Sequence, residues 1–160
     1  MRQVIPSIAF KMTADQLSAA ITNRTKLVIL NSPSNPTGMV YSRDELTALA
    51  DVIVANDLWV LSDEIYEKLV YDHEHVSIAQ LGSDIADKTL LVNGHSKAFS
   101  MTGWRIGYCA VPSSLATVMS RIQSHTTSNP VSFSQWGAIE ALKTPLDAVY
   151  AMRDAFQRRR

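Results

Sequence analysis

The stretch VNGHSKAFSMTGWRIGY, residues 92–108, joins two apolar segments and decides how they are connected. It holds one lysine, Lys97, one arginine, Arg105, and three glycines. A connection between parallel strands needs about a dozen residues and is usually a helix. Residues 94–104 are broken by glycine and show no helical period. We therefore expect the strand near residues 106–111 to run antiparallel to the strand before it.

Before this stretch, short apolar runs alternate with helical patterns. The runs LVIL (27–30), WVL (59–61) and TLLV (89–92) are typical of strands buried on both faces of a sheet. Helices are predicted at 13–23 and 42–54, each opened by a capping box, and at 113–126, 132–143 and 147–160. The alternation predicts an α/β fold with three α/β/α layers, whose mostly parallel sheet has one antiparallel strand.

The composition is that of an ordinary globular chain, with 46% hydrophobic and 19% charged residues among 160. The 15 basic residues balance the 15 acidic ones, which gives no electrostatic case for binding nucleic acid or an anionic membrane. One cysteine, Cys109, excludes an internal disulfide and suits a reducing compartment. Residues 1–11 are too short an apolar stretch for a secretory signal, and no run reaches the roughly 18 residues of a membrane span. We expect a cytoplasmic protein.

Polar side chains follow three of the predicted strands where each strand ends. Asn31 and Asn35 follow the first strand, Asp63 the second and Lys97 the third. Each has an ordinary explanation by itself: a turn before a proline, a cap or a surface lysine. Because the carboxyl ends of parallel strands meet at one edge of a sheet, where ligands bind in open α/β folds, their convergence predicts a binding site there.

Other kinds of site lack residues that they need. A strand ending in Asp63-Glu64 is also typical of magnesium-binding nucleotide hydrolases, but GHSKA is not their phosphate-binding G-x-x-x-x-G-K-[ST] motif. His73 and His75 lie in a polar stretch without a cysteine or a spaced carboxylate partner, so we interpret them as surface histidines and expect no metal site. No G-x-S-x-G elbow or Cys/His pair indicates acyl transfer.

A lysine, an aspartate, amide or phenol donors and an arginine at one sheet edge are the groups that pyridoxal phosphate chemistry uses. The lysine forms a Schiff base with the cofactor aldehyde. The aspartate keeps the pyridine nitrogen protonated through a charge-assisted bond worth about 1.5–3 kcal/mol. An arginine such as Arg105 can bind phosphate oxygens with two parallel N–H donors.

Three motifs resemble those of fold-type I, class I/II aminotransferases, and most closely the aspartate/prephenate subgroup. They are NSPSNPTG (31–38), SDEIYEKLVYD (62–72) and SKAFSMTGWRIGY (96–108), in the family's order, and the resemblance runs from Phe10 to Arg160. It implies amino-group transfer between an amino acid and a 2-oxo acid in amino-acid metabolism and biosynthesis. The implied cofactor is pyridoxal 5'-phosphate, and the implied assembly is a cytoplasmic homodimer without nucleic-acid or membrane partners.

The resemblance also implies that residues 1–160 are the central part of the large cofactor-binding domain. The small domain and the N-terminal segment would lie outside the chain, which we expect to be incomplete and inactive alone. Lys97 would be the Schiff-base lysine and the base that moves the substrate proton, and Asp63 would pair with the pyridine nitrogen. Tyr66 and Asn35 would bond the cofactor's phenolate oxygen, and Asn35 would also reach the substrate carboxylate.

Arg105 would bind the cofactor phosphate by the same resemblance, and Ser96 would belong to the cofactor site. The chain departs from the family at two positions. Gly94 stands where many members have a serine that binds phosphate, three residues before the lysine. Ser124 stands four residues before the S-N-P motif at 128–130, where one aspartate-specific branch has the arginine that reads the distal carboxylate. We therefore expect broad specificity or a distal-carboxylate ligand from outside this segment.

Two alternatives remain open from the sequence. A fold-type I lyase, such as one that breaks C–S bonds, uses the same cofactor residues and differs in substrate-binding segments outside these motifs. A non-catalytic truncated remnant that keeps the sheet is the alternative from a different class. Intact Lys97, Asp63, Tyr66 and Arg105 argue against the remnant.

Overall fold

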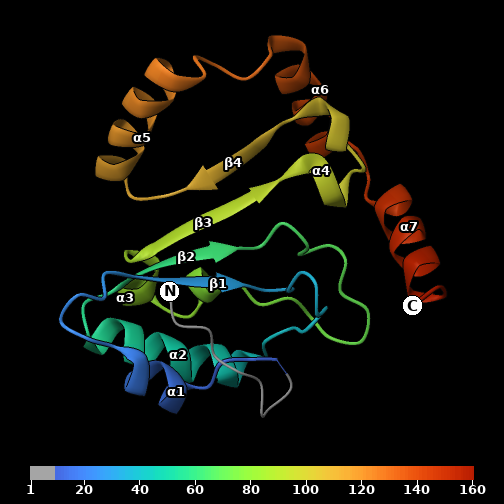
Figure 1. Ribbon diagram of the computed structural model, residues 1–160. Helices are drawn as coiled ribbons and strands as arrows, with labels where there is room; N and C mark the ends of the chain where they lie inside the picture. The colour runs from blue at the N-terminus through green and yellow to red at the C-terminus, as the bar shows by residue number, and fades with distance from the viewer. Residues whose placement is uncertain (1–9) are drawn as a thin grey trace.

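The computed structural model describes residues 10–160, which contain a four-stranded sheet in the order β1-β2-β3-β4 (Figure 1). The strands β1 (Leu27–Asn31), β2 (Trp59–Asp63) and β3 (Thr89–Gly94) are parallel, and β4 (Gly107–Ala110) pairs antiparallel with β3. The predicted mostly parallel sheet with one antiparallel strand is confirmed. The prediction that residues 1–11 hold no secretory signal falls almost wholly on residues 1–9, which lie outside the described range.

The connection between β3 and β4 contains two short helical turns that the sequence did not indicate. The first, α4 (His95–Ala98), is a single turn of α-helix, and the 3-10 turn η2 (Thr102–Trp104) follows it. Neither carries the chain across the sheet, so β4 returns beside β3 in the opposite direction. Helices of three or four residues are too short to produce a helical period in a sequence.

On one side of the sheet lie α1 (Ala14–Ala20) and α2 (Arg43–Ala55), side by side (Figure 1). Both begin at the predicted capping boxes, although α1 ends three residues before the predicted residue 23. Their apolar faces pack with the inward side chains of β1 and β2 into one core, in which Leu49, Ile53 and Val60 are fully buried. The short turns η1 (Ile78–Gln80) and α3 (Ser83–Ala86) extend this core before β3 begins.

After β4 come α5 (Ser113–Thr126), α6 (Ser132–Lys143) and α7 (Asp147–Gln157), which lie beyond β4 and at the end of the sheet (Figure 1). They match the predicted ranges, except that α7 ends at Gln157. The sheet face opposite α1 and α2 is open within the described residues, and Ile29 on that face is 65% exposed. No helix in residues 10–160 has the length and apolar character needed to cross a membrane.

Candidate active site

The carboxyl ends of β1, β2 and β3 lie next to one another because the three strands are parallel. Asn31 faces Asp63 across the β1–β2 pairing, and Asp63 faces Val92 across the β2–β3 pairing. The Nδ2 atom of Asn31 donates to the Asp63 carbonyl oxygen at 3.2 Å, and its Oδ1 accepts from the backbone N–H of Asn35 at 2.8 Å. Asn31 therefore fixes the loop after β1 to the end of β2.

A cavity of about 1050 Å³ opens at this edge of the sheet. Four predicted site residues line it together: Asn35, Tyr66, Ser96 and Lys97. The Lys97 ammonium lies 5.6 Å from the centroid of the Tyr66 ring, and Asn35 Nδ2 donates to the Tyr66 hydroxyl at 3.3 Å. Because a phenol can both accept and donate, the O–H of Tyr66 remains available to donate to a ligand.

Asp63 lies beside this group but does not line the cavity. Its Oδ1 accepts from the backbone N–H of Ile65 at 3.2 Å, so the carboxylate also fastens the turn that leads to Tyr66. The residue is half-buried at the end of β2. The structure thus places Asp63 at the predicted edge of the sheet, with one oxygen already used by its own backbone.

Arg105 also lies outside the cavity lining. It has a left-handed backbone conformation, with φ of 51°, and its Nη1 donates to the Thr102 carbonyl oxygen at 2.9 Å. A non-glycine residue in this conformation costs on the order of 1–2 kcal/mol, and such strain is concentrated at functional sites. Thr102 does line the cavity, and the guanidinium has further N–H donors for an anion.

The turn that carries Arg105 is supported by α6. A Cβ atom on Gly137 would lie 2.6 Å from Cζ3 of Trp104, so only glycine allows the helix to approach the indole this closely. Trp104 also meets Phe133 edge to face, with the ring centroids 6.3 Å apart. Residues of α6 therefore hold η2 and, through it, the position of Arg105.

Sequence reasoning missed much of the cavity wall. Its further charged and histidine side chains are Lys11, Asp72, His73, Arg159 and Arg160. Arg160 forms an ion pair with Asp72, and its guanidinium lies 5.4 Å from the centroid of the Tyr71 ring. The paired residues are 88 positions apart, a separation at which no local pattern indicates a contact.

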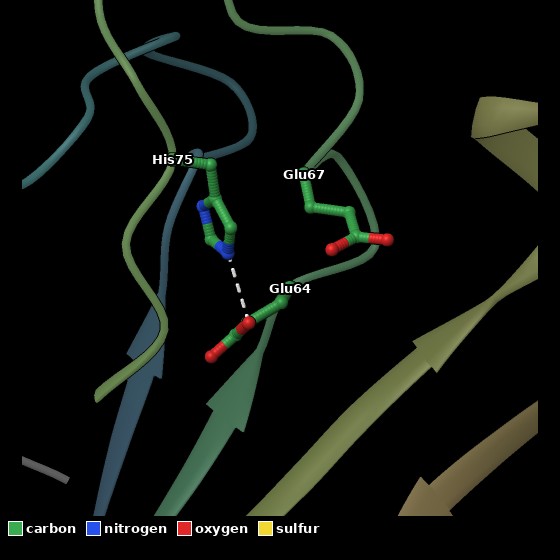
Figure 2. A group of neighbouring side chains, drawn as sticks. All are labelled: Glu64, Glu67 and His75. Carbon is green, nitrogen blue, oxygen red and sulfur yellow. Dashed lines mark hydrogen bonds and ion pairs between the residues drawn. The ribbon is translucent and has the colours of Figure 1, made fainter. Parts of the chain in front are cut away.

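The prediction that His75 is a surface histidine without a carboxylate partner is wrong. The side chain of His75 is only 13% exposed, and its Nε2 lies 2.9 Å from Oε2 of Glu64, the carboxylate partner that the sequence did not indicate (Figure 2). The two residues are 11 positions apart, and a folded-back loop brings them together. His73 is exposed, as predicted, and lines the cavity.

His95, which precedes Ser96 and Lys97 in α4, is buried and was not singled out by the sequence. It is 3% exposed, and within residues 10–160 neither ring nitrogen makes a hydrogen bond of good geometry, although the backbone of Ala138 lies near the ring. Its ring stacks on Phe99 with the centroids 5.5 Å apart and meets Tyr108 edge to face at 5.8 Å. Burial lowers the pKa of His95, because the charged imidazolium loses its hydration.

Comparisons with known proteins agree on one family. The family model "Aminotransferase class I and II" matches residues 3–160. The aspartate aminotransferase of Bacillus sp. (strain YM-2) is 52% identical over 151 residues, which cover 94% of this chain and 38% of the relative. The aspartate/prephenate aminotransferase of Cereibacter sphaeroides is 52% identical over 153 residues, with the same coverage.

A solved structure extends this likeness to three dimensions. The crystal structure of the aspartate aminotransferase from Rhizobium meliloti matches with a TM-score of 0.92 and 46% sequence identity, over 94% of this chain and 38% of that chain. The chain therefore spans less than half the length of these relatives.

Proposed function

The chain belongs to the class I and II aminotransferase family, and we propose that the whole protein transfers an amino group between an amino acid and a 2-oxo acid. The family depends on pyridoxal phosphate, which is the cofactor proposed for this protein. One observation carries the proposal: Lys97, Tyr66 and Asn35 converge in one cavity, with the Lys97 ammonium 5.6 Å from the Tyr66 ring.

The residues at this edge of the sheet suit the cofactor chemically. A lysine amine can bind an aldehyde covalently, and the phenol of Tyr66 can donate to a ring oxygen. The carboxylate of Asp63 can pair with a protonated ring nitrogen, and the guanidinium of Arg105 can bind phosphate. A cavity of about 1050 Å³ is large enough, because small-molecule sites usually measure about 300–1,000 Å³.

Residue 94 is a glycine, so it supplies no hydroxyl to the proposed phosphate site. A Cβ atom there would lie 3.0 Å from the Cα of Gly107 and 3.2 Å from the Ile106 carbonyl oxygen. A serine would therefore require β4 to move away from β3. The close approach of the two glycines therefore favours glycine over serine at residue 94 in this chain.

When bound, the cofactor supplies an electron-accepting ring that stabilises negative charge on the substrate α-carbon. Lys97 would hold the cofactor through Nζ, and the same amine would accept the proton that leaves the substrate α-carbon, as a general base. Tyr66, which accepts a hydrogen bond from the amide of Asn35, would orient the ring through its O–H. Asp63 would supply the negative charge that favours a protonated ring nitrogen.

For the whole protein we further propose a cytoplasmic homodimer that acts in amino-acid biosynthesis, with residues 1–160 as part of its large domain. The relatives' names support a role in amino-acid metabolism. Exposed apolar side chains on α5 and α6, among them Ile122, Phe133 and Trp136, support burial against other parts of the assembly. The equal numbers of basic and acidic residues support small-molecule substrates rather than nucleic acid.

The direct test uses the full-length protein with pyridoxal phosphate, an amino acid and a 2-oxo acid. Formation of the new amino acid and the new 2-oxo acid in equal amounts is the expected result. Release of ammonia or a thiol without any need for the 2-oxo acid would instead indicate the lyase alternative. Lack of both reactions would favour a non-catalytic protein.

A further inference from the structure

Glu64 is a buried carboxylate that the proposed chemistry does not use. It stands between Asp63 and Tyr66 in the chain and is only 3% exposed. Its backbone N–H donates to the Val92 carbonyl oxygen at 2.9 Å, which extends the pairing of β2 with β3 by one residue. A buried carboxylate is costly unless hydrogen bonds satisfy it, so its partners show what it holds together.

Three side chains bond the two carboxylate oxygens of Glu64. Ser62 and Ser77 donate their hydroxyls to Oε1 at 2.9 and 2.8 Å. His75 Nε2 lies 2.9 Å from Oε2, the contact that Figure 2 shows as a dashed line. A carboxylate oxygen accepts hydrogen bonds, so the His75 tautomer with its hydrogen on Nε2 satisfies this contact. All three donors point at one buried group, so each carboxylate oxygen has a partner.

The donors come from two separate parts of the chain. Ser62 belongs to β2, whereas His75 and Ser77 belong to the segment that follows the cavity-lining residues Asp72 and His73. Glu64 therefore ties residues 75–77, which directly follow the cavity-lining residues 71–73, to the end of the strand that carries Asp63. The backbone N–H of residue 67 also donates to the Glu64 carbonyl oxygen at 2.9 Å, within the turn that presents Tyr66.

Glu67 is a nearby carboxylate that takes no part in these bonds. One side-chain oxygen of Glu67, one of Glu64 and one ring nitrogen of His75 lie within 4.8 Å of one another. Figure 2 shows the three side chains together. Both Glu64 oxygens have a hydrogen-bond partner, so hydrogen bonds explain why Glu64 and His75 lie together. Glu67 instead approaches Lys68 at 3.5 Å and is partly exposed, which makes it a matched control for Glu64.

We propose that Glu64 is a positioning residue of the aminotransferase site. Its carboxylate holds residues 75–77 against the end of β2 and thereby fixes the turn that presents Asp63 and Tyr66. The inference rests on the proposed function, because Asp63 and Tyr66 are the groups through which Glu64 acts. Loss of the carboxylate releases both the cavity wall and the turn.

The test compares Glu64→Ala, Glu64→Gln and Glu67→Gln in the full-length protein. Amide hydrogen exchange over residues 64–77 is measured without cofactor, and kcat and KM are measured per cofactor-loaded site. Glu64→Ala is expected to speed exchange in this segment and to lower kcat roughly 10- to 100-fold, the scale for a small misplacement of catalytic groups.

The other two variants show whether geometry or charge matters. Glu64→Gln keeps an acceptor oxygen for the two serines and an N–H for the other tautomer of His75, so it is expected to recover most of kcat. Glu67→Gln should leave both exchange and kcat unchanged. A loss of kcat in Glu67→Gln equal to that in Glu64→Ala would contradict a specific role for Glu64.

A carboxylate that only stabilises the fold would lower the unfolding temperature of Glu64→Ala and leave kcat per loaded site unchanged. That result would overturn the assignment. Where Glu64→Ala does not fold, Ser77→Ala removes one donor more gently, and unchanged kcat in that variant overturns the assignment equally. Absence of amino transfer in the unmodified protein would instead contradict the proposed function, so the two failures are distinguishable.

Discussion

The ammonium of Lys97 lies 5.6 Å from the centroid of the Tyr66 ring. Tyr66 follows β2 and Lys97 follows β3, and the parallel pairing of these strands brings the two side chains to one edge of the sheet. The same cavity contains Asn35, which holds the Tyr66 hydroxyl. An amine beside a held phenol is a suitable arrangement for an aldehyde cofactor whose ring must be both attached and oriented.

Lys97 is predicted to be the attachment point of the cofactor. Borohydride reduction of the full-length protein with pyridoxal phosphate, followed by peptide mapping, should place the pyridoxyl group on Lys97. Lys97→Ala should lower turnover by at least about 10²-fold, because it also removes the general base. Lys88, which forms an ion pair with Asp57, is the control lysine. A pyridoxyl group on Lys88 would contradict the assignment.

Asp63→Asn is predicted to leave the cofactor bound and to slow turnover by roughly 10²-fold or more, the scale for removing a preorganised charge-stabilising group. The physical reason is that asparagine cannot supply the negative charge that keeps a ring nitrogen protonated. Asparagine retains a side-chain oxygen for the N–H of Ile65, so the local turn should persist. Cofactor absorbance and steady-state rates measure the two effects separately. Turnover at the parental rate would remove Asp63 from the site.

Gly137→Ala is predicted to displace Trp104, because the added Cβ would lie 2.6 Å from the indole ring. The better helix propensity of alanine contributes up to about 1 kcal/mol, whereas overpacking costs about 1–3 kcal/mol, so a net loss of about 1 kcal/mol is expected. Urea unfolding and cofactor affinity measure the outcome in the full-length protein. Gly103→Ala is the matched control, since its Cβ would meet nothing within 4 Å. Equal stability of the two variants would contradict the packing role of Gly137.

The strand directions were predictable because they depend on local features of the sequence. Continuous apolar runs marked the three parallel strands, and the short, glycine-broken connection after β3 required β4 to turn back. The capping boxes at Thr13 and Ser42 depend only on residues three positions apart, so both helix starts were predictable. The gathering of Asn35 and Lys97 followed from the parallel arrangement, and the family resemblance added Tyr66.

The features of the site that the sequence did not predict depend on contacts between residues far apart in the chain or on backbone conformation. Glu64 pairs with His75 across a folded-back loop, and Arg160 pairs with Asp72 across most of the chain. The bond of Arg105 to the Thr102 carbonyl accompanies a left-handed backbone conformation of Arg105. An arginine in a sequence does not predict that conformation. These features belong to tertiary packing, which overrides sequence propensity.

His95 is predicted to make the protein less stable in acid. Its pKa is lowered from 6.5 by burial, so the unfolded chain binds a proton that the folded chain rejects. Stability should therefore fall as the pH drops below about 6.5 and continue to fall until the folded form is protonated as well. His95→Phe keeps an aromatic ring against Phe99 and should weaken this dependence when unfolding is measured between about pH 8 and about pH 5. An equally steep fall in stability in His95→Phe and in the unmodified protein would contradict this role of His95.

Substrate specificity is predicted not to depend on Ser124. Its hydroxyl donates to the Arg121 carbonyl oxygen at 2.8 Å on the exposed helix α5 and supplies no charge for a distal carboxylate. Ser124→Ala should change kcat/KM for aspartate by less than about twofold, the usual range for a surface substitution. Aspartate, aromatic and aliphatic donors should be compared in the same assay. A loss confined to aspartate and larger than tenfold would show that this position reads the distal carboxylate after all.

The spacing of the cavity residues constrains how the protein folds. Asn35, Tyr66 and Lys97 follow one another at intervals of 31 positions in the sequence (66 − 35 and 97 − 66). Each step closes a long loop, and the entropy of that closure is lost before the contacts compensate for it. The three side chains meet only after both parallel pairings have formed. Before that point the folding chain has no site that the cofactor could occupy. Cofactor capture during refolding should therefore lag behind helix formation and report the completion of the sheet.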